Sequence, residues 1–172
     1  MSEEAPVEES NLLVRDVLRM FTYGLYVAAS VGPDGPRAAT ISWVTQVSFE
    51  PKLIAIAVRK GTGIHDAIVA SRRFALHIVG LEQADFAKAF FKAGSAKGGA
   101  EHIAGYDFRL SERGVPVFEA APAWLECELV EDACREGVAD HDLLVAQVID
   151  SGYRSPGTPV LALRDTPWHY GG

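Results

Sequence analysis

The chain has 172 residues, of which 48% are apolar and 23% are charged, as in an ordinary globular domain that buries a core. Its 16 basic residues are outnumbered by 23 acidic ones, and the net charge of −7 argues against a surface that binds nucleic acid or an anionic membrane. No apolar run approaches the roughly 20 residues that cross a bilayer.

The first ten residues are acidic and lack the basic region and apolar core of a signal peptide. We expect residues 1–10 to form a disordered tail, followed by a single domain over residues 11–172 of a cytoplasmic protein. Ser10 can cap a helix over residues 11–20, in which leucine and valine side chains recur at helical spacing.

A hairpin is predicted next. Residues 23–29 have the composition of a strand, and Asp34-Gly35 with its flanking prolines favours a turn. Residues 38–47 would return as the second strand. Residues 53–58 are continuously apolar, which predicts a further strand buried on both faces.

The rest of the chain predicts more strands than helices. A mobile loop is expected over the glycine-rich residues 94–105. The other expected elements are helices over residues 64–70 and 82–92, and strands over 74–79, 123–130, 143–149 and 159–163. Because strands and helices do not alternate and no glycine fingerprint opens a helix, a nucleotide-binding parallel sheet is not supported. The pattern favours a closed antiparallel barrel with a few peripheral helices.

Metal and disulfide chemistry find little support in the sequence. The two cysteines, Cys127 and Cys134, do not have a zinc-site spacing, and we expect free thiols in a reducing compartment. The five histidines show no ligand spacing either, so no metal is expected.

The stretch from Thr40 to Lys60 combines the groups that a flavin mononucleotide requires. Hydroxyl and amide side chains at Thr40, Ser42 and Gln46 would share one strand face, and a fully apolar strand follows. That strand ends in Arg59-Lys60, where cations and a following helix start can bind a phosphate. Taken alone, the polar alternation is more typical of a strand with one solvated face.

The order of these features resembles the flavin reductase-like family of the FMN-binding split barrel. The resemblance covers roughly residues 18–170 and rests on order and spacing more than on any single motif. The matching residues are Phe21 and Gly24, Thr40-Ile41-Ser42, Ser48-Phe49-Glu50-Pro51, the apolar strand, Arg59 to His65, Phe74, Gln83, Ala87, Phe90, Gly114-Val115-Pro116, Ala123, Leu125-Glu126-Cys127 and Asp140-His141. The departures are Trp43, Ile64, His77 and Ala139, the last where a glycine is usual.

The resemblance implies a mainly β, antiparallel split β-barrel of Greek-key type that works as a homodimer. It assigns the flavin ring to Thr40 and Ser42 with the backbone of Trp43 and Val44. Ser48 would contact the phosphate or ribityl chain. The phosphate is assigned to Arg59 and Lys60, with hydrogen bonds from Thr62 and His65. His141 would lie near flavin and nicotinamide as the catalytic residue; the alternative is a histidine satisfied by Asp140 at a strand start.

The implied activity is hydride transfer from NADH or NADPH to bound FMN, with FAD a possible flavin. Electrons would then pass to a partner such as a monooxygenase, to free flavin or to a ferric complex. The alternative that remains open is an FMN-binding electron carrier or sensor without nicotinamide activity. An oxidase of the pyridoxamine-phosphate type is disfavoured, because Ser48-Phe49-Glu50-Pro51 and Asp140-His141 match the reductases better. The aromatic tail, Trp168 to Tyr170, would either pack on its own subunit or cover the flavin of a partner.

Overall fold

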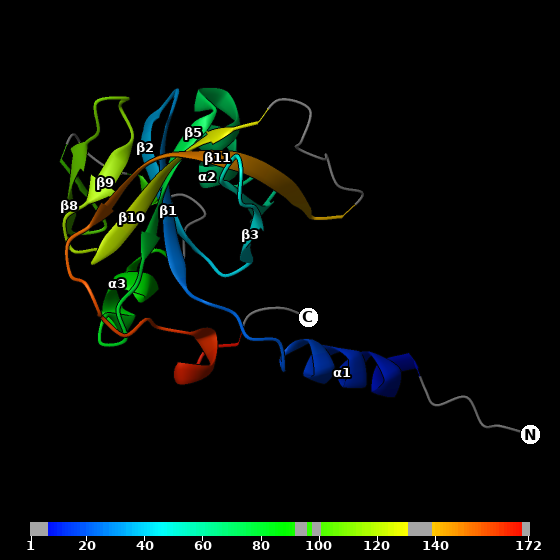
Figure 1. The fold of residues 1–172 in the computed structure, drawn as a ribbon. Helices are drawn as coiled ribbons and strands as arrows, with labels where there is room; N and C mark the ends of the chain where they lie inside the picture. The colour runs from blue at the N-terminus through cyan, green and yellow to red at the C-terminus, as the bar shows by residue number, and fades with distance from the viewer. Residues whose placement is uncertain (1–6, 92–95, 98–100, 131–138, 170–172) are drawn as a thin grey trace, which may run out of the picture.

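A computed structural model of the chain describes residues 7–91, 96–97, 101–130 and 139–169 (Figure 1). The helices are α1 (Val7–Leu18), α2 (Gly63–Ser71), α3 (Ala84–Ala89) and the short 3-10 helix η2 (Leu163–Asp165). The strands are β1 (Tyr26–Gly32), β2 (Gly35–Ile41), β3 (Val44–Ser48), β4 (Leu53–Arg59), β5 (Arg73–Ile78), β6 (Ala96–Lys97), β7 (His102–Ile103), β8 (Tyr106–Leu110), β9 (Pro116–Phe118), β10 (Ala123–Leu129) and β11 (His141–Tyr153).

One antiparallel sheet of eight strands dominates the molecule, in the order β3-β4-β11-β10-β5-β1-β2-β6. β11 returns to pair with β4 and β10 returns to pair with β5, which are long-range connections of Greek-key type. The predicted mainly β, antiparallel fold is confirmed. Within the described residues, however, the edge strands β3 and β6 do not pair with each other, so this sheet is not the closed barrel that the strand pattern favoured.

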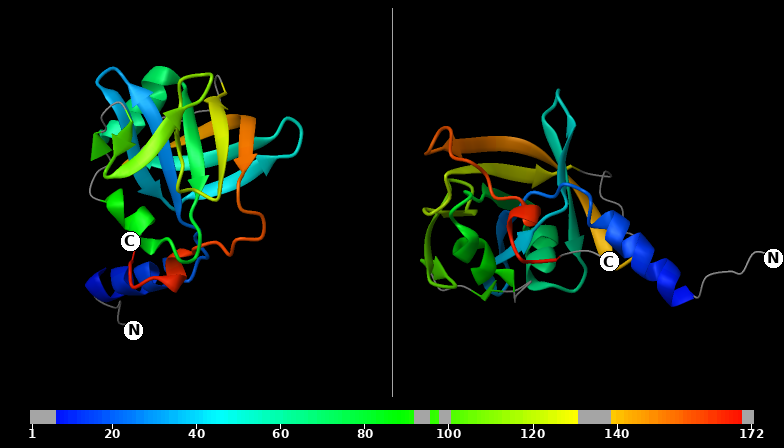
Figure 2. Two further views of the ribbon diagram at one scale, coloured as in Figure 1. Left: turned by 90° about the vertical axis from the view of Figure 1, so that its left-hand side faces the viewer. Right: turned by 90° about the horizontal axis from the view of Figure 1, so that it is seen from below.

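Two hydrophobic clusters lie on either side of this sheet. One joins α2 to the sheet through Ile64, Ile68 and Phe74. There the helix approaches so closely that a Cβ on Gly32 would lie 3.1 Å from the Ala67 side chain. The other contains the aromatic rings of α3 and of a small sheet formed by β7, β8 and β9, which the sequence did not predict. Figure 2 shows this small sheet and α3 at one end of the molecule.

The expected elements are found with several changes of boundary. The helix predicted over residues 11–20 begins at Val7, so the last four residues of the predicted tail are helical. Residues 1–6 lie outside the described part, as do Tyr170, Cys134 and residues 94–95 and 98–100 of the predicted glycine-rich loop. The described remainder of that loop contains the short strands β6 and β7. The strand predicted over 159–163 is reduced to two isolated bridges, Gly24 with Ala162 and Gly80 with Val160.

The largest change concerns the strand predicted over residues 38–47. It is broken at Ser42–Trp43, because β2 pairs with β1 whereas β3 pairs with β4. Thr40, Ser42 and Gln46 therefore do not share one strand face, as the alternation had indicated. The break leaves Ser42 at a junction between two strand pairs.

Candidate functional site

Ser42 is the residue on which the candidate site centres. Its side chain is buried, with 4% of the residue exposed, and no described residue is a hydrogen-bond partner for its Oγ. Buried hydroxyls in folded proteins are nearly always paired, so an orphaned one indicates a group still to be bound. Ser42 also lines two adjoining cavities, of about 180 and about 500 Å³.

The larger cavity lies over the outward face of β3, β4 and β11. Trp43 and Val44 line it beside Ser42, and Ala57 and Leu143 form its floor. The floor is apolar because small side chains from β4 lie beside Leu143, which is 48% exposed. Its size and apolar lining are those of a cofactor site.

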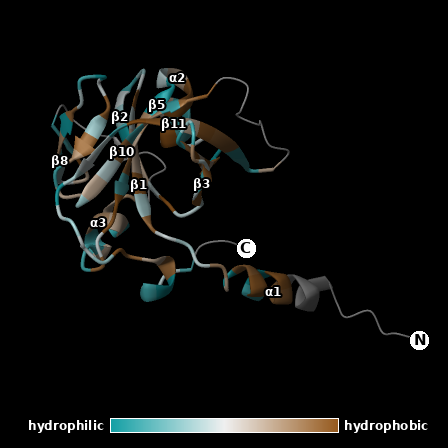
Figure 3. Cartoon of the chain, in the orientation of Figure 1, coloured by the Kyte–Doolittle hydropathy of each residue, from teal (hydrophilic) through white to brown (hydrophobic). Residues whose placement is uncertain are grey.

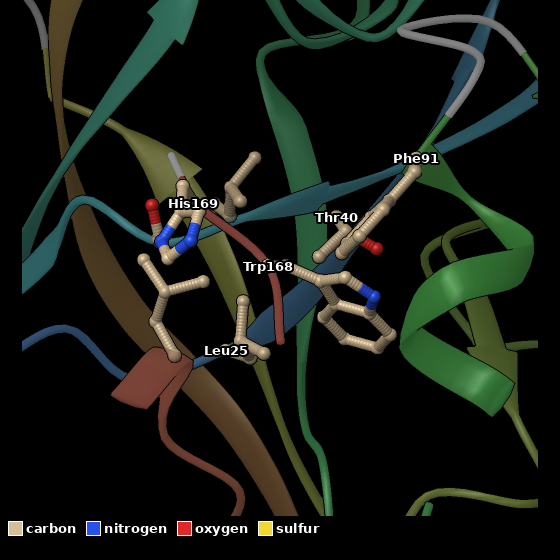
Figure 4. Close-up of a pocket in the computed structure, with 8 residues that line it drawn as sticks. Leu25, Thr40, Phe91, Trp168 and His169 are labelled. Carbon is tan, nitrogen blue, oxygen red and sulfur yellow. The ribbon is translucent and has the colours of Figure 1, made fainter. Parts of the chain in front are cut away.

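The smaller cavity lies between β2 and the C-terminal segment (Figure 4). Thr40, Phe91 and Trp168 converge on it, and the Phe91 and Trp168 rings meet edge to face at 4.5 Å. Thr40 has a structural role as well, since its hydroxyl donates to the carbonyl of Ala87 at 2.6 Å. Through the contact with Phe91, Trp168 packs on its own subunit, which is one of the two expectations for the aromatic tail.

His141 opens β11 and lies directly opposite Arg59 of β4. Its ring centroid is 4.7 Å from that of Trp43, at the margin of the larger cavity. Its Nδ1 lies 2.8 Å from an Asp140 carboxylate oxygen, and this hydrogen bond lowers the pKa of Asp140. The structure thus brings Ser42, Trp43, Val44, Arg59 and His141 together. It also contains the contact with Asp140 that the alternative interpretation of His141, a histidine satisfied at a strand start, required.

The remaining phosphate candidates gather at the start of α2. Thr62 is the N-cap of this helix: its Oγ1 accepts from the backbone of His65 and donates to the Arg59 carbonyl at 2.8 Å. Lys60 Nζ lies 3.4 Å from one oxygen of Asp142, and His65 Nε2 lies 2.9 Å from the other. His65 Nδ1 is 3.0 Å from Asp66.

Ser48 does not join this group within one subunit. It lies at the β3–β4 turn, opposite Leu53, whereas Arg59 ends the same strand six residues later. Six strand residues span roughly 20 Å. Within one subunit the hairpin places Ser48 and Lys60 at opposite ends of β4, which favours the ribityl chain over the phosphate for Ser48; its contact with the flavin tail stays a prediction.

Two features of the site were missed in the sequence. Asp142 is the first: alternation along β11 places it on the same face as Leu144 and Ala146, which are buried. A carboxylate at a core-facing position was the signal that could have identified it. The second is Phe91, which lines the smaller cavity with Trp168 and for which no local pattern predicts a site role.

Within the described ranges, no group of three or more potential metal ligands is found. The same part of the chain contains no helix long and apolar enough to cross a membrane.

A family model of the flavin reductase like domain matches residues 18–166, and the chain belongs to this family. It is 27% identical over 155 residues to FMN reductase (NADH) SmoA of Agrobacterium fabrum, a match that covers 90% of this chain and 83% of the relative. It is 30% identical over 156 residues to the reductase component of a 4-nitrophenol 4-monooxygenase/4-nitrocatechol 2-monooxygenase of Rhodococcus opacus, covering 91% and 79%.

Among solved structures, the fold is similar to NADH:FAD oxidoreductase SgcE6 of Streptomyces globisporus. The TM-score is 0.73 at 27% identity, and the match covers 94% of this chain and 93% of that one. The split-barrel family expected from the order of motifs is thus confirmed.

Proposed function

We propose that this chain is an NAD(P)H-dependent flavin reductase that binds FMN across the larger cavity. The observation that carries the proposal is the buried, orphaned hydroxyl of Ser42, which faces cavities of a size and apolar lining suited to a flavin ring. Relatives named as FMN reductase and as a monooxygenase reductase component support the same function.

The residues present fit a bound flavin. Ser42 would hydrogen-bond the polar edge of the ring together with the backbone of Trp43 and Val44, while Ala57 and Leu143 support its apolar part. Arg59 ends β4 two residues beyond Ala57, and Lys60 follows it at up to roughly 10 Å along the strand direction. Both would face the phosphate with Thr62 and His65. When bound, the flavin supplies the hydride-accepting chemistry.

His141 is the residue assigned to the nicotinamide side of the site. Asp140 holds its Nδ1 at 2.8 Å, so that a fixed ring presents Nε2 at the margin of the cavity. With its proton on Nδ1, the neutral imidazole has a lone pair on Nε2, which can accept a hydrogen bond from a carboxamide N–H and orient that group over the Trp43 side of the site. The protein's contribution is then binding and orientation, with water displaced from an apolar floor.

We further propose a homodimer in the cytoplasm. α1 projects from the body of the molecule, and Figure 3 shows hydrophobic residues along it. Leu13, Val14 and Val17 on this helix are each more than half exposed. An apolar surface of this kind favours burial against a second copy. The free, buried thiol of Cys127 supports a reducing compartment.

The electron acceptor would be a partner oxygenase, free flavin or a ferric complex. The Rhodococcus relative is a reductase component of a monooxygenase, which supports the first of these.

The test is an anaerobic titration of the purified protein supplied with FMN. We expect flavin absorbance to co-elute with the protein and to bleach on addition of NADH or NADPH. Flavin that binds but does not bleach with either nucleotide would favour the electron-carrier alternative. Failure to retain FMN or FAD at all would refute the proposal.

A further inference from the structure

Asp142 is a buried carboxylate that the proposed function does not use. Only 8% of the residue is exposed, and it faces the core from the second position of β11. Its two oxygens contact two different cationic or potentially cationic groups, Lys60 at 3.4 Å and His65 at 2.9 Å. These are two of the four side chains assigned to the flavin phosphate.

The contacts have a clear electrostatic origin. A carboxylate taken out of water requires opposite charge and hydrogen-bond donors, and Asp142 has both from the loop and helix that follow β4. Thr62, the third candidate, has its hydroxyl hydrogen directed to the Arg59 carbonyl. The donors at this end of the site are therefore already engaged by groups of the protein itself.

An arriving phosphate would meet a negative charge among the groups meant to bind it. Lys60 cannot give its full charge to a phosphate while it is paired with Asp142, and the two anions repel each other across a partly buried site where screening by water is weak. Arg59, the fourth side chain assigned to the phosphate, ends β4 directly opposite His141.

We propose that Asp142 is a specificity-determining residue whose carboxylate competes with the flavin phosphate for Lys60 and His65, so that this chain binds riboflavin nearly as tightly as FMN. The inference rests on the proposed function, because it presupposes that a flavin occupies the site. It adds a statement about specificity, namely that the site recognises the flavin ring system and gains little affinity from the phosphate of FMN.

The experiment compares dissociation constants for FMN and riboflavin by fluorescence titration of the full chain. Wild type should bind FMN less than about tenfold more tightly than riboflavin. Asp142→Asn should lower the dissociation constant of FMN by about tenfold and change that of riboflavin little, because it removes one unit charge a few ångströms from the phosphate. The matched control is Asp66→Asn, which removes an equal charge 3.0 Å from the same histidine at a side chain that is 67% exposed. It should change either constant less than about twofold.

Lys60→Ala provides a second variant. It leaves the carboxylate without this cation, so FMN should weaken much more than riboflavin. Equal loss of both ligands would overturn the competition.

The possible failures are distinguishable. A wild-type preference for FMN of about a hundredfold or more would overturn the inference and leave the flavin site intact, even if Asp142→Asn does not fold. Unchanged or weaker FMN binding in a folded Asp142→Asn protein, verified by its circular dichroism, would do the same. Binding of neither flavin by wild type would remove the proposed function and the inference with it.

Discussion

His77 lies at the centre of the sheet and is completely buried. Its Nδ1 lies 2.8 Å from the Val27 carbonyl, and its Nε2 accepts the backbone N–H of Phe118 at 3.0 Å. This pair of contacts requires the neutral ring with its proton on Nδ1. Burial is the main reason that the pKa of His77 falls from 6.5 to about 4. The residue therefore ties β5 to β1 and to the small sheet only while it is uncharged.

The lowered pKa predicts that acid destabilises the fold. Below pH 6.5 the unfolded chain takes up a proton at this position and the folded chain does not, so stability is full above 6.5 and falls as the pH approaches 4. The loss should reach about 3 kcal/mol, at about 1.4 kcal/mol per unit of pKa. Urea unfolding of wild type and His77→Asn between pH 7 and 4.5 measures it, and the variant should have a flatter profile.

The matched control for this measurement is His102→Asn. His102 is a surface histidine, 61% exposed in its side chain, that contacts Asp107. Its replacement should leave the acid slope of wild type unchanged. A His77→Asn protein with the full wild-type slope would contradict the assignment.

A second residue-scale prediction concerns His141. Replacement by alanine removes the ring beside Trp43 and should lower the rate of NADH-dependent flavin reduction by about tenfold to a hundredfold, as expected for one lost hydrogen bond of about 1–3 kcal/mol. Flavin affinity should change less. Stopped-flow measurement of flavin bleaching separates the two. Asp140→Asn keeps an acceptor near Nδ1 and should have a smaller effect; an unchanged rate in His141→Ala would show that the histidine is structural.

At the scale of elements, α1 carries the prediction about assembly. If its apolar face packs on a second copy, Leu13→Ser removes an exposed leucine from the interface and should weaken dimerisation by about tenfold or more. Asp16→Ser is the matched control, because Asp16 is 62% exposed and charged. Sedimentation over a range of protein concentrations measures both variants. Identical association constants for wild type and Leu13→Ser would place the interface elsewhere.

The elements that were predictable have strong local signals. The apolar run that forms β4 and the turn at Asp34-Gly35 depend on neighbouring residues, and both are found. The break at Ser42–Trp43 had no such signal, because it arises where the chain exchanges one pairing strand for another. The short strands of the small sheet are likewise formed by tertiary pairing.

The site was predictable to a similar degree. Order along the chain placed Ser42, Trp43 and Val44 together, since they are adjacent, and the resemblance placed His141 with them. Neither the order of residues nor the resemblance predicted the ion pair between Asp142 and Lys60, because these residues meet only through the pairing of β4 with β11. The separation of Ser48 from Lys60 was likewise not predictable, because it depends on how β3 and β4 pair as a hairpin.

At the scale of the whole molecule, the candidate site draws on β3, β4, α2 and β11 at once. Flavin bound there should stabilise the folded chain as a unit. At a free FMN concentration of about 100 times the dissociation constant, the free energy of unfolding should rise by about 2.7 kcal/mol. Thermal unfolding followed by far-ultraviolet circular dichroism and by flavin fluorescence should give coincident transitions. Flavin release well below the unfolding temperature would contradict a site built from all four elements.

The pairing of β4 with β11 has a consequence for the chain as it is synthesised. On the ribosome, the apolar residues of β4 emerge long before the partner strand that covers one of its edges. Until then the β3–β4 hairpin of the nascent chain presents a hydrophobic strand with one unpaired edge, the kind of segment that chaperones bind and that associates with other unfinished chains. Because His141 meets Trp43 only after that pairing, the complete candidate site forms only once β11 has been synthesised.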